Sequence, residues 1–362
     1  MLRIEQLRLT QFKNHPDRTY EFRSRIVGIT GPNGVGKTNL LDALYTLCFS
    51  RGYFSRSDQS LVRHGETGFR IDGSIRRKDQ LNEVTLILRE TAKKEIFHDG
   101  DLLPRLSDHL GRFPVVMIAP DDAELIMGES KTRRQFLDAI ICQIDGNYLQ
   151  VLSKFNRLLQ QRQALLKDCS ESGATPDALA LLDVLDEQCA ETIRTIKPAR
   201  SLWHARLHER MLTLYASIAG QAEPIGMVYH CDLPEEDPLP ILRASRTRDL
   251  AAQRNTRGPH RDDLLFTLGG HPFKQVASQG QRKTLLFALK LAERSLLEEF
   301  LTLPPVVLLD DVFEKLDPSR ITALLHWVAT HTQSQVFITD TDSARMRQHL
   351  DPLDPDWQLL EC

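Results

Sequence analysis

A glycine-rich stretch near the N-terminus has the residue types and spacing needed to hold a chain of phosphates. It follows the pattern GxxxxGK[ST] and reads Gly31, Pro32, Asn33, Gly34, Val35, Gly36, Lys37 and Thr38. Glycines let the backbone curl so that its N–H groups point inward, and a helix that follows adds the positive end of its dipole. Lys37 can place a positive charge on the β- and γ-phosphates, and the Thr38 hydroxyl can bind Mg²⁺. We therefore expect a site for a nucleoside triphosphate and Mg²⁺, with Asn39 as a further contact.

The flanking sequence argues for this site and against the alternative, a glycine turn that merely caps a helix. Residues 26–30 form a short β-branched run, which predicts a buried strand. Leucines at helical spacing follow the loop, at positions 40, 41, 44 and 47. Strand, glycine loop and helix in this order are the context that the phosphate-binding motif requires.

Two adjacent carboxylates, Asp310 and Asp311, end an apolar stretch over residues 306–309. In open α/β sheets, ligands bind at the carboxyl ends of the strands. We expect Asp310 to bind Mg²⁺, directly or through water. Asp311 would orient or deprotonate the attacking water, so that Asp311 and Lys37 are the expected catalytic residues. The alternative is two solvated aspartates at a strand end, against which the phosphate loop argues.

The motif Ser278-Gln279-Gly280-Gln281 lies between a predicted hairpin and a long helical stretch. Taken alone, it predicts a serine N-cap. Its place between the phosphate loop and the aspartate pair is the motif order of ABC-type ATPases, in which ATP is the nucleotide. Such ATPases set the SxGQ motif of one subunit against the γ-phosphate bound by the other. Ser278, Gly280 and Gln281 are therefore expected nucleotide contacts in trans, and capping is compatible with that role.

Apolar patterning divides the chain into three regions that would position these motifs. Residues 1–120 read as short strands and one early helix, residues 121–224 as a helical lobe, and residues 225–362 as strands and helices again. The last region includes a hairpin predicted over residues 263–278. The predicted fold class is therefore α/β: an ABC-type ATPase head with mixed sheets around the phosphate-loop helix, plus an inserted helical lobe. Residues 225–362 would carry the SxGQ motif and the aspartate pair.

Composition sets further limits on the class of protein. The 362 residues are 41% hydrophobic and 26% charged, with a net charge of −3, which is typical of a globular chain and excludes a bulk polycation. No apolar run is long enough to span a bilayer, and the N-terminus starts directly into an alternating pattern. Six scattered cysteines suit a reducing compartment. We expect a cytoplasmic protein without a membrane partner.

Several longer strings resemble the RecF family of bacterial proteins, which are relatives of SMC ATPase heads. The strings cover most of the chain and include GPNGVGKTNLLDAL, RRQFLD at residues 133–138, GPHRDD at 258–263, ASQGQRKTLLFALKLAE at 277–293 and LLDDVFEKLD at 308–317. The GPHRDD and RRxFLD strings are more specific than the generic ATPase motifs.

The resemblance implies activity and partners that the residue pattern alone does not. It implies slow, DNA-stimulated hydrolysis of ATP to ADP and phosphate by an ATP-dependent homodimer. It implies action at single-strand gaps and junctions with RecO and RecR, to help load recombinase onto DNA. It also implies nucleotide contacts from Lys13, where relatives often have arginine, and from Asp317 in a D-loop-like turn.

Other polar residues have less specific interpretations. Basic residues of the first region are candidate DNA contacts: Arg51, Arg56, Arg63, Arg70, Arg76, Arg77 and Lys78. Arg133 and Arg134 could instead form salt bridges within the helical lobe. His204 and His208 have a spacing that could bind a metal, but no third ligand is evident. His260 could lie near the nucleotide or help to shape the hairpin.

Two other functions share the ATPase motifs. A transporter's nucleotide-binding subunit is one, but such cassettes place the SxGQ motif much closer to the phosphate loop than the 240 residues between Thr38 and Ser278. An SMC-like head that serves as a scaffold without turnover is the other, and it predicts that Asp311 is dispensable.

Overall fold

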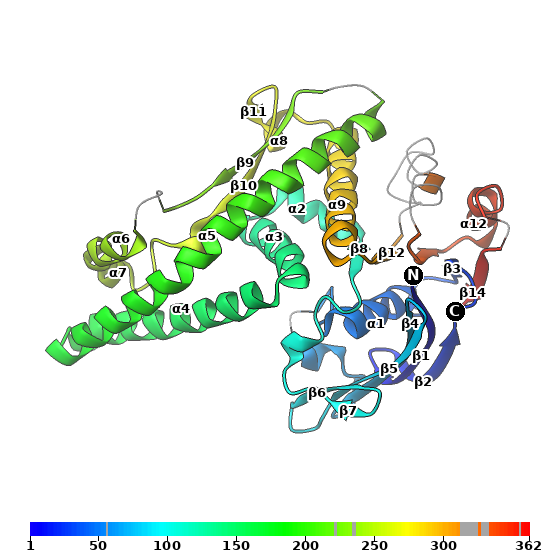
Figure 1. The fold of residues 1–362 in the computed structure, drawn as a ribbon, viewed down its shortest axis with the longest axis horizontal. Coiled ribbons are helices and arrows are strands. Elements are labelled where there is room, and N and C mark those ends of the chain that lie inside the picture. Colours follow the sequence, from blue (N-terminus) through cyan, green and yellow to red (C-terminus); the bar gives the residue numbers. More distant parts are fainter. Residues whose placement is uncertain (56, 221–222, 234–236, 312–324, 327–332, 355) are drawn as a thin grey trace. The chain divides into compact units, whose positions relative to one another are not determined.

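The computed structural model describes residues 1–362 except 56, 221–222, 234–236, 312–324, 327–332 and 355 (Figure 1). The described chain falls into two compact units. Unit 1 comprises residues 1–123, 213–221 and 283–362, and unit 2 comprises residues 124–212 and 222–282. The predicted region 225–362 is thus divided between the units. The boundaries after residues 212 and 282 fall inside long helices, α5 (Pro176–Ala219) and α9 (Gln279–Leu301), whose continuous patterns give no sign of a break.

Within its described residues, unit 1 contains two sheets. One is antiparallel, in the order β2-β1-β4-β5-β6-β7, and the other is parallel, in the order β14-β3-β13-β12-β8. The antiparallel strands are β1 (Leu2–Phe12), β2 (His15–Glu21), β4 (Phe69–Arg77), β5 (Gln80–Leu88), β6 (Lys94–His98) and β7 (Asp101–Leu102). The parallel strands are β3 (Ile26–Thr30), β8 (Val115–Ile118), β12 (Val306–Leu309), β13 (Val336–Asp340) and β14 (Gln358–Glu361). Short 3-10 turns occur at η1 (Asp58–Leu61), η2 (Leu106–Asp108) and η3 (Pro120–Asp122).

Helix α1 (Lys37–Phe49) packs against both sheets of unit 1. Its apolar residues, including Leu40, Leu44 and Leu47, join one buried cluster with residues of β1, β3, β4 and β8. The approach to β4 is close, since a Cβ built on Gly73 would lie 2.3 Å from the Leu47 side chain. A larger residue at this position would require the Leu47 side chain to move, so glycine allows the helix to pack closely on the sheet. The helix in turn fixes the loop that precedes it.

The opposite face of the parallel sheet carries a second buried cluster. Phe287 and Leu291 of α9 and Met346 of α12 (Ser343–Leu350) pack on residues of β12 and β13, with the end of α5 at the edge. Both faces of these strands are therefore covered, which explains why they read as continuous apolar runs rather than alternating ones. Their carboxyl ends lie together at one edge because all four pairings are parallel.

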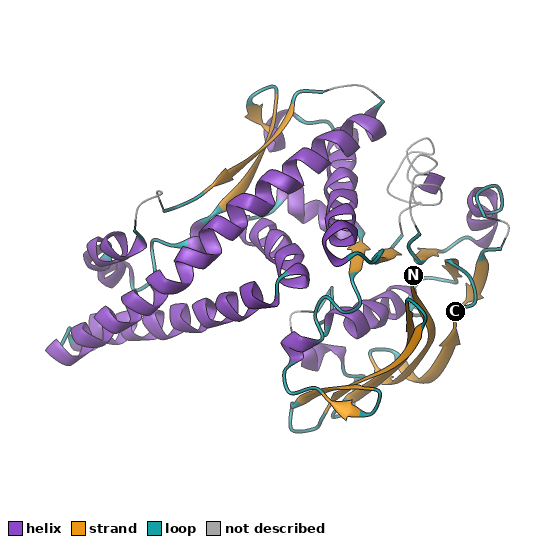
Figure 2. Ribbon diagram, in the orientation of Figure 1, coloured by secondary structure: helices purple, strands orange, loops and turns teal. Residues whose placement is uncertain are grey.

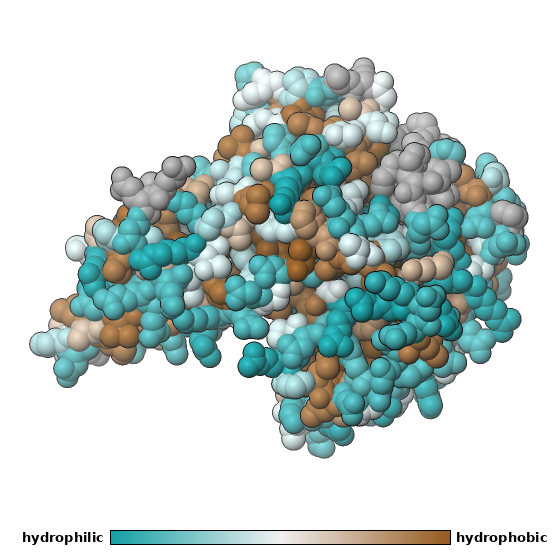
Figure 3. Space-filling model, viewed as in Figure 1, coloured by the Kyte–Doolittle hydropathy of each residue, from teal (hydrophilic) through white to brown (hydrophobic). Residues whose placement is uncertain are grey.

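Unit 2 combines long helices with a small antiparallel sheet in the order β11-β10-β9 (Figures 1 and 2). Its helices are α2 (Ala123–Met127), α3 (Ser130–Ile144), α4 (Gly146–Ser172), α5, α6 (Pro238–Ala244), α7 (Arg246–Ala252), the turn η4 (Pro259–Arg261) and α8 (Phe273–Val276). Its strands are β9 (Ile225–His230), β10 (Asp263–Leu268) and β11 (His271–Pro272). Helices α4 and α5 form an antiparallel hairpin, on whose visible face hydrophilic residues predominate in Figure 3.

Two predicted elements differ from the structure. Early in the helical lobe predicted over 121–224, residues 130–172 form two helices rather than one, because the Asp145 carboxylate accepts hydrogen bonds from Asn147 N and Tyr148 N and so starts α4 anew. The predicted hairpin over 263–278 ends early: β11 is two residues long, and Phe273–Val276 is the helical turn α8. Phe273 is buried as an inward strand residue would be, so the apolar pattern did not distinguish the two conformations.

None of the helices in the described part of the chain combines the length and apolar character that crossing a membrane requires.

A buried pair of histidines closes the C-terminal end of α1. His98 Nε2 lies 2.8 Å from His109 Nδ1, and His109 Nε2 lies 2.7 Å from the Leu47 carbonyl oxygen. Arg112 Nη1 donates to His98 Nδ1 at 3.0 Å. One pair of neutral tautomers satisfies all three contacts: each Nε2–H donates and each Nδ1 accepts. Burial, with smaller contributions from the neighbouring His98 and Arg112, lowers the pKa of His109 to about 4.

The depressed pKa of His109 predicts a loss of stability on mild acidification. The unfolded chain binds this proton near pH 6.5 whereas the folded chain resists it until about pH 4, so stability falls with pH below 6.5. Between pH 7.5 and pH 5 the wild type should lose on the order of 2 kcal/mol that the His109→Gln variant does not lose. Urea unfolding at the two pH values measures this difference. Equal pH dependence in the two proteins would contradict it.

Candidate nucleotide-binding and hydrolysis site

The glycine-rich loop joins β3 to α1, as its flanks predict. Gly31, Gly34 and Gly36 have φ angles of 150°, 83° and 110°, which side-chain-bearing residues rarely adopt. Gly36 is the N-cap of α1 and supplies no side-chain cap, so the N–H groups of the first turn are not covered by a capping side chain. Such a helix start is suited to bind an anion.

Lys37 lies across this loop. Its side chain is buried, and its ammonium donates hydrogen bonds to the carbonyl oxygens of Gly31 at 2.8 Å and Pro32 at 3.0 Å. An ammonium has three N–H donors, so these two contacts leave one for a phosphate oxygen. The lysine therefore both shapes the loop and can place its charge on a bound phosphate.

Asn14 supports the glycine-rich loop through two hydrogen bonds. Its Nδ2 donates to the Val35 carbonyl oxygen at 3.0 Å, and its Oδ1 accepts from Asn39 Nδ2 at 2.8 Å. A Cβ on Gly36 would lie 2.5 Å from Asn14 Nδ2, so the asparagine fills the space that a larger residue would need. No local pattern reveals its role, because the residue lies in the turn between β1 and β2.

The predicted nucleotide contact Lys13 is engaged elsewhere in this structure. Its ammonium lies 2.5 Å from Oδ2 of Asp42, a fully buried residue of α1, and 5.8 Å from the centre of the Phe54 ring. The other oxygen of Asp42 accepts from Tyr53 N at 2.6 Å. Lys13 therefore neutralises a buried carboxylate and links the β1–β2 turn to α1, next to the hydrogen bonds that Asn14 makes with the loop.

Asp310 lies at the carboxyl end of β12 and contacts the phosphate loop directly. The Thr38 hydroxyl donates to its two carboxylate oxygens, at 3.0 and 3.1 Å. The two residues predicted to bind Mg²⁺, 272 positions apart in sequence, are thus in contact. The pKa of Asp310 is raised to about 6. Burial is the main cause and the neighbouring Asp311 adds to it, whereas Thr339, Thr38 and Lys37 act in the opposite direction.

This donor set fits a Mg²⁺ ion. Magnesium is bound by one or two protein oxygens together with water and phosphate oxygens, and Thr38 and Asp310 supply a hydroxyl and a carboxylate. A buried carboxylate with a raised pKa is also a group that a cation would stabilise in its charged form. When bound, Mg²⁺ would neutralise charge on the β- and γ-phosphates.

Thr339 connects the two aspartates. Its fully buried hydroxyl, at the end of β13, donates to Asp310 Oδ1 at 2.8 Å and accepts from Asp311 N at 2.9 Å. The backbone of Asp311 has a φ of 43°, a conformation that aspartate tolerates better than most residues. Thr339 thus orients one carboxylate and holds the backbone of the next. No local sequence pattern predicts this bridge.

The SxGQ motif starts α9 with a reciprocal cap. Gln281 N donates to Ser278 Oγ at 3.2 Å, and Ser278 N donates to Gln281 Oε1 at 2.9 Å. This capping box confirms the N-cap predicted for Ser278. The predicted D-loop residue Asp317 lies outside the described residues.

The two most specific strings, RRQFLD and GPHRDD, bind each other within unit 2. Arg133 forms a two-point ion pair with Asp263, at 2.7 and 2.9 Å. A salt bridge was expected for Arg133, but its partner belongs to β10 and not to the helical lobe predicted over 121–224. Arg200 of α5 joins Asp138 to Asp262, at 2.9 and 2.8 Å, with every partner largely buried. Loss of one partner from either pair would leave an uncompensated buried charge and so destabilise unit 2.

The histidines singled out by spacing also have structural partners. His204 Nε2 lies 3.0 Å from the Met227 carbonyl oxygen, and His208 Nε2 accepts from Met227 N at 3.4 Å. The pair therefore attaches β9 to α5. His260 Nε2 lies 3.1 Å from the Asn255 carbonyl oxygen, and its ring lies against Phe155. Its contacts are with the polypeptide that surrounds the GPHRDD string.

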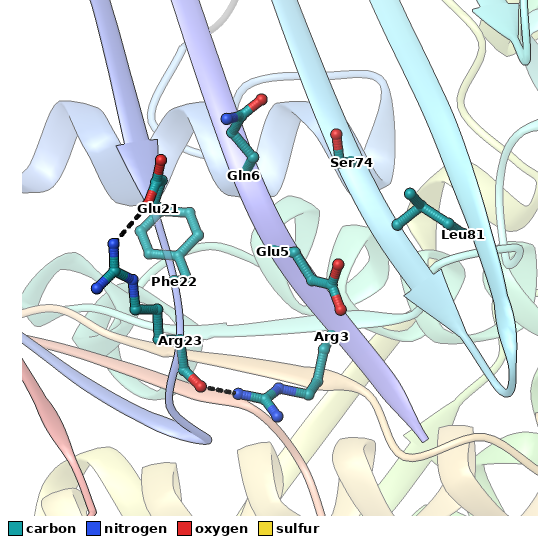
Figure 4. A pocket seen from close by; sticks show the side chains of 8 residues that line it. All are labelled: Arg3, Glu5, Gln6, Glu21, Phe22, Arg23, Ser74 and Leu81. Atoms are coloured by element: carbon teal, nitrogen blue, oxygen red, sulfur yellow. Dashed lines mark hydrogen bonds and ion pairs between the residues drawn. The ribbon is translucent and has the colours of Figure 1, made fainter.

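The candidate DNA contacts of unit 1 are partly neutralised. Arg70 pairs with Asp72 and Arg76 pairs with Glu5, on the outer face of the antiparallel sheet. A pocket on that face, shown in Figure 4, is lined by Arg3, Glu5, Gln6, Glu21, Phe22, Arg23, Ser74 and Leu81. Its arginines also bond to protein, Arg23 to Glu21 and Arg3 to a backbone carbonyl.

The remaining candidates of this set differ in exposure. Arg51, Arg77 and Lys78 are exposed, and Arg63 lies 3.3 Å from Gln11 Oε1. Arg56 lies outside the described residues.

Comparison with known proteins places this geometry in a family. The model of the RecF/RecN/SMC N terminal domain matches residues 3–353. DNA replication and repair protein RecF of Flavobacterium johnsoniae is 34% identical over 95% of both chains. RecF of Porphyromonas gingivalis W83 is 36% identical over 98% of this chain and 95% of its own. The chain belongs to the RecF family.

Solved structures agree with this assignment. A recombination mediator protein RecF with ATP, of the RecFOR pathway, superposes with a TM-score of 0.87 at 30% identity, over 95% of this chain and 93% of the other. An SMC head domain of Pyrococcus furiosus gives a TM-score of 0.54 at 15% identity, which bears on the fold alone. The predicted fold class, an ATPase head of this type with an inserted helical lobe, is confirmed.

The bridge formed by Thr339 predicts a specific defect in this RecF-family chain. Thr339→Val keeps the shape of the side chain but removes the hydroxyl between Asp310 and Asp311. We expect Mg²⁺-dependent ATP turnover to fall by roughly 10- to 100-fold, as for other residues that orient metal ligands. Nucleotide binding without Mg²⁺ should be unchanged, because the phosphate loop is untouched.

Thr339→Ser is the matched control, since it restores the hydroxyl and should recover most of the turnover. Steady-state phosphate release and fluorescent-nucleotide binding measure the two quantities. Full turnover by the valine variant would show that the bridge does not orient the aspartates.

Proposed function

We propose that this chain is an ATP-dependent DNA clamp of recombinational repair and replication restart. ATP binding pairs two copies, and hydrolysis to ADP and phosphate separates them. The observation that carries this proposal is the convergence of Thr38, Asp310 and Thr339 beside the glycine loop, an arrangement suited to bind and hydrolyse Mg²⁺-ATP. The RecF relative solved with ATP supports the same nucleotide.

The chemistry assigns a role to each residue of the site. Lys37 and the N–H groups of α1 hold the phosphates, Thr38 and Asp310 hold Mg²⁺, and Asp311 orients or deprotonates the attacking water. Because little covalent chemistry falls to the protein in phosphoryl transfer, positioning and electrostatic stabilisation dominate. Hydrolysis is slow and is stimulated by DNA.

Pairing of two copies follows from what the γ-phosphate needs. Charge that develops on its oxygens is stabilised by donors on more than one side. We assign the second set of donors to Ser278, Gly280 and the start of α9 in the partner copy. The capping box already orders the start of α9 within one chain. Dimerisation therefore does not need to order this segment.

The DNA and protein partners come from the family. Relatives are DNA replication and repair proteins, and one acts in the RecFOR pathway. We propose that the paired heads hold DNA at single-strand gaps and junctions, and act with RecO and RecR to help load recombinase. Contacts to backbone phosphates suit a protein of net charge −3 that carries only local basic groups.

The pairing claim predicts a variant that binds ATP but stays monomeric. Ser278→Arg places a bulky cation where the partner's nucleotide would dock, and should abolish ATP-dependent dimerisation. Its affinity for ATP as a monomer should match the wild type. Sedimentation velocity with and without ATP measures dimerisation, and fluorescent-nucleotide titration measures the affinity of the monomer for ATP.

Ser201→Arg, at an exposed position of α5, is the matched control and should dimerise normally. A Ser278→Arg protein that still dimerises with ATP counts against the proposal.

The clamp claim predicts a preference among DNA structures. Gapped duplex should bind more tightly than blunt duplex of equal length, and only in the presence of ATP. Binding should weaken steeply with salt because phosphate contacts dominate. Fluorescence anisotropy across a salt series makes the comparison, and equal affinity for both duplexes with ATP would reject the preference for gaps.

A further inference from the structure

The amide of Gln281 is held in one orientation by two partners with opposite requirements. Its Oε1 accepts from Ser278 N at 2.9 Å, and its Nε2 donates to Glu223 Oε2 at 2.8 Å. A carboxylate only accepts hydrogen bonds, and a backbone N–H only donates. A flipped amide would therefore set oxygen against carboxylate and NH₂ against N–H, so Ser278 N and Glu223 together determine which way Gln281 points.

Gln281 also holds the side chain of Ser278, through its backbone N–H. In the capping box the Ser278 hydroxyl oxygen accepts from Gln281 N, at 3.2 Å. A hydroxyl also has one donor proton, which this contact does not use. With the box in place, Ser278 presents an O–H donor at a helix start, which suits an oxyanion.

Glu223 is itself anchored to the small sheet of unit 2. Its carbonyl oxygen accepts from Ile225 N at 2.8 Å, at the first residue of β9. The carbonyl oxygen of the next residue, Pro224, accepts from Gly269 N at 2.8 Å, just beyond β10. The carboxylate therefore projects from backbone that the β9–β10 ladder fixes, and can serve as a support for Gln281.

We propose that Glu223 is the positioning residue of the SxGQ motif, and that it keeps Ser278 set as a donor to the γ-phosphate bound by the partner copy. This inference rests on the proposed function. By its negative charge alone, a carboxylate near a triphosphate should weaken ATP-dependent dimerisation. The carboxylate of Glu223 instead strengthens dimerisation, because it holds Gln281 in place.

Three substitutions separate orientation from charge. Glu223→Ala removes the support, and should raise the protein concentration needed for half-maximal ATP-dependent dimerisation about tenfold, as expected for a lost bond to a charged group. Glu223→Gln can still accept through its Oε1 and should stay within about twofold of the wild type. Glu223→Lys offers only donors, favours the flipped amide, and should impair dimerisation at least as much as Glu223→Ala.

The measurements are sedimentation equilibrium with ATP, nucleotide affinity of the monomer, and hydrogen exchange of the Ser278 and Gln281 amides without ATP. The alanine and lysine variants should exchange faster and dimerise worse, with unchanged monomer affinity for ATP. Glu171→Ala, at an exposed glutamate of α4, is the matched control.

Dimerisation strengthened by Glu223→Lys would overturn the proposal in favour of a charge effect. Normal dimerisation by both Glu223→Ala and Glu223→Lys, alongside failure of Ser278→Arg, would overturn it while leaving the proposed function intact. A wild type that stays monomeric with ATP would overturn the proposed function and this inference together.

Discussion

A single buried carboxylate organises the candidate site. Asp310 receives hydrogen bonds from Thr38, at the start of the phosphate-loop helix, and from Thr339, at the end of a neighbouring strand. Its own N–H donates to Ile118 of β8, so three adjacent elements of the parallel sheet meet at one residue. Burial makes this carboxylate costly to charge, which is why its pKa is raised and why a cation fits beside it.

The sequence predicted the parts of this site that depend on local patterns. The glycine loop, the strand before it and the helix after it are found where their residue types placed them, and so is the strand that ends at Asp310. These features follow from backbone sterics and from burial on both faces of a strand. The N-cap role of Ser278 follows from the same kind of local rule.

What the sequence did not predict depends on contacts between distant residues. Asn14 supports a loop 21 residues away, and Glu223 supports a glutamine 58 residues away, yet neither lies in a pattern of its own. The division of residues 225–362 between the two units was also not predicted, because α9 is one continuous helix across the boundary. For Arg133 and Asp263 the situation is the opposite. Their sequence strings are distinctive, but the two residues form an ion pair with each other within unit 2.

The central claim is that each nucleotide is completed by a second copy of the chain. The most direct measurement is a structure of the Asp311→Asn variant with ATP and Mg²⁺, in which slowed turnover preserves the closed state. We expect Ser278 Oγ to lie within about 3 Å of a γ-phosphate oxygen of the nucleotide held by the partner's phosphate loop. A structure in which Ser278 lies far from every triphosphate, its own and the partner's, would contradict it.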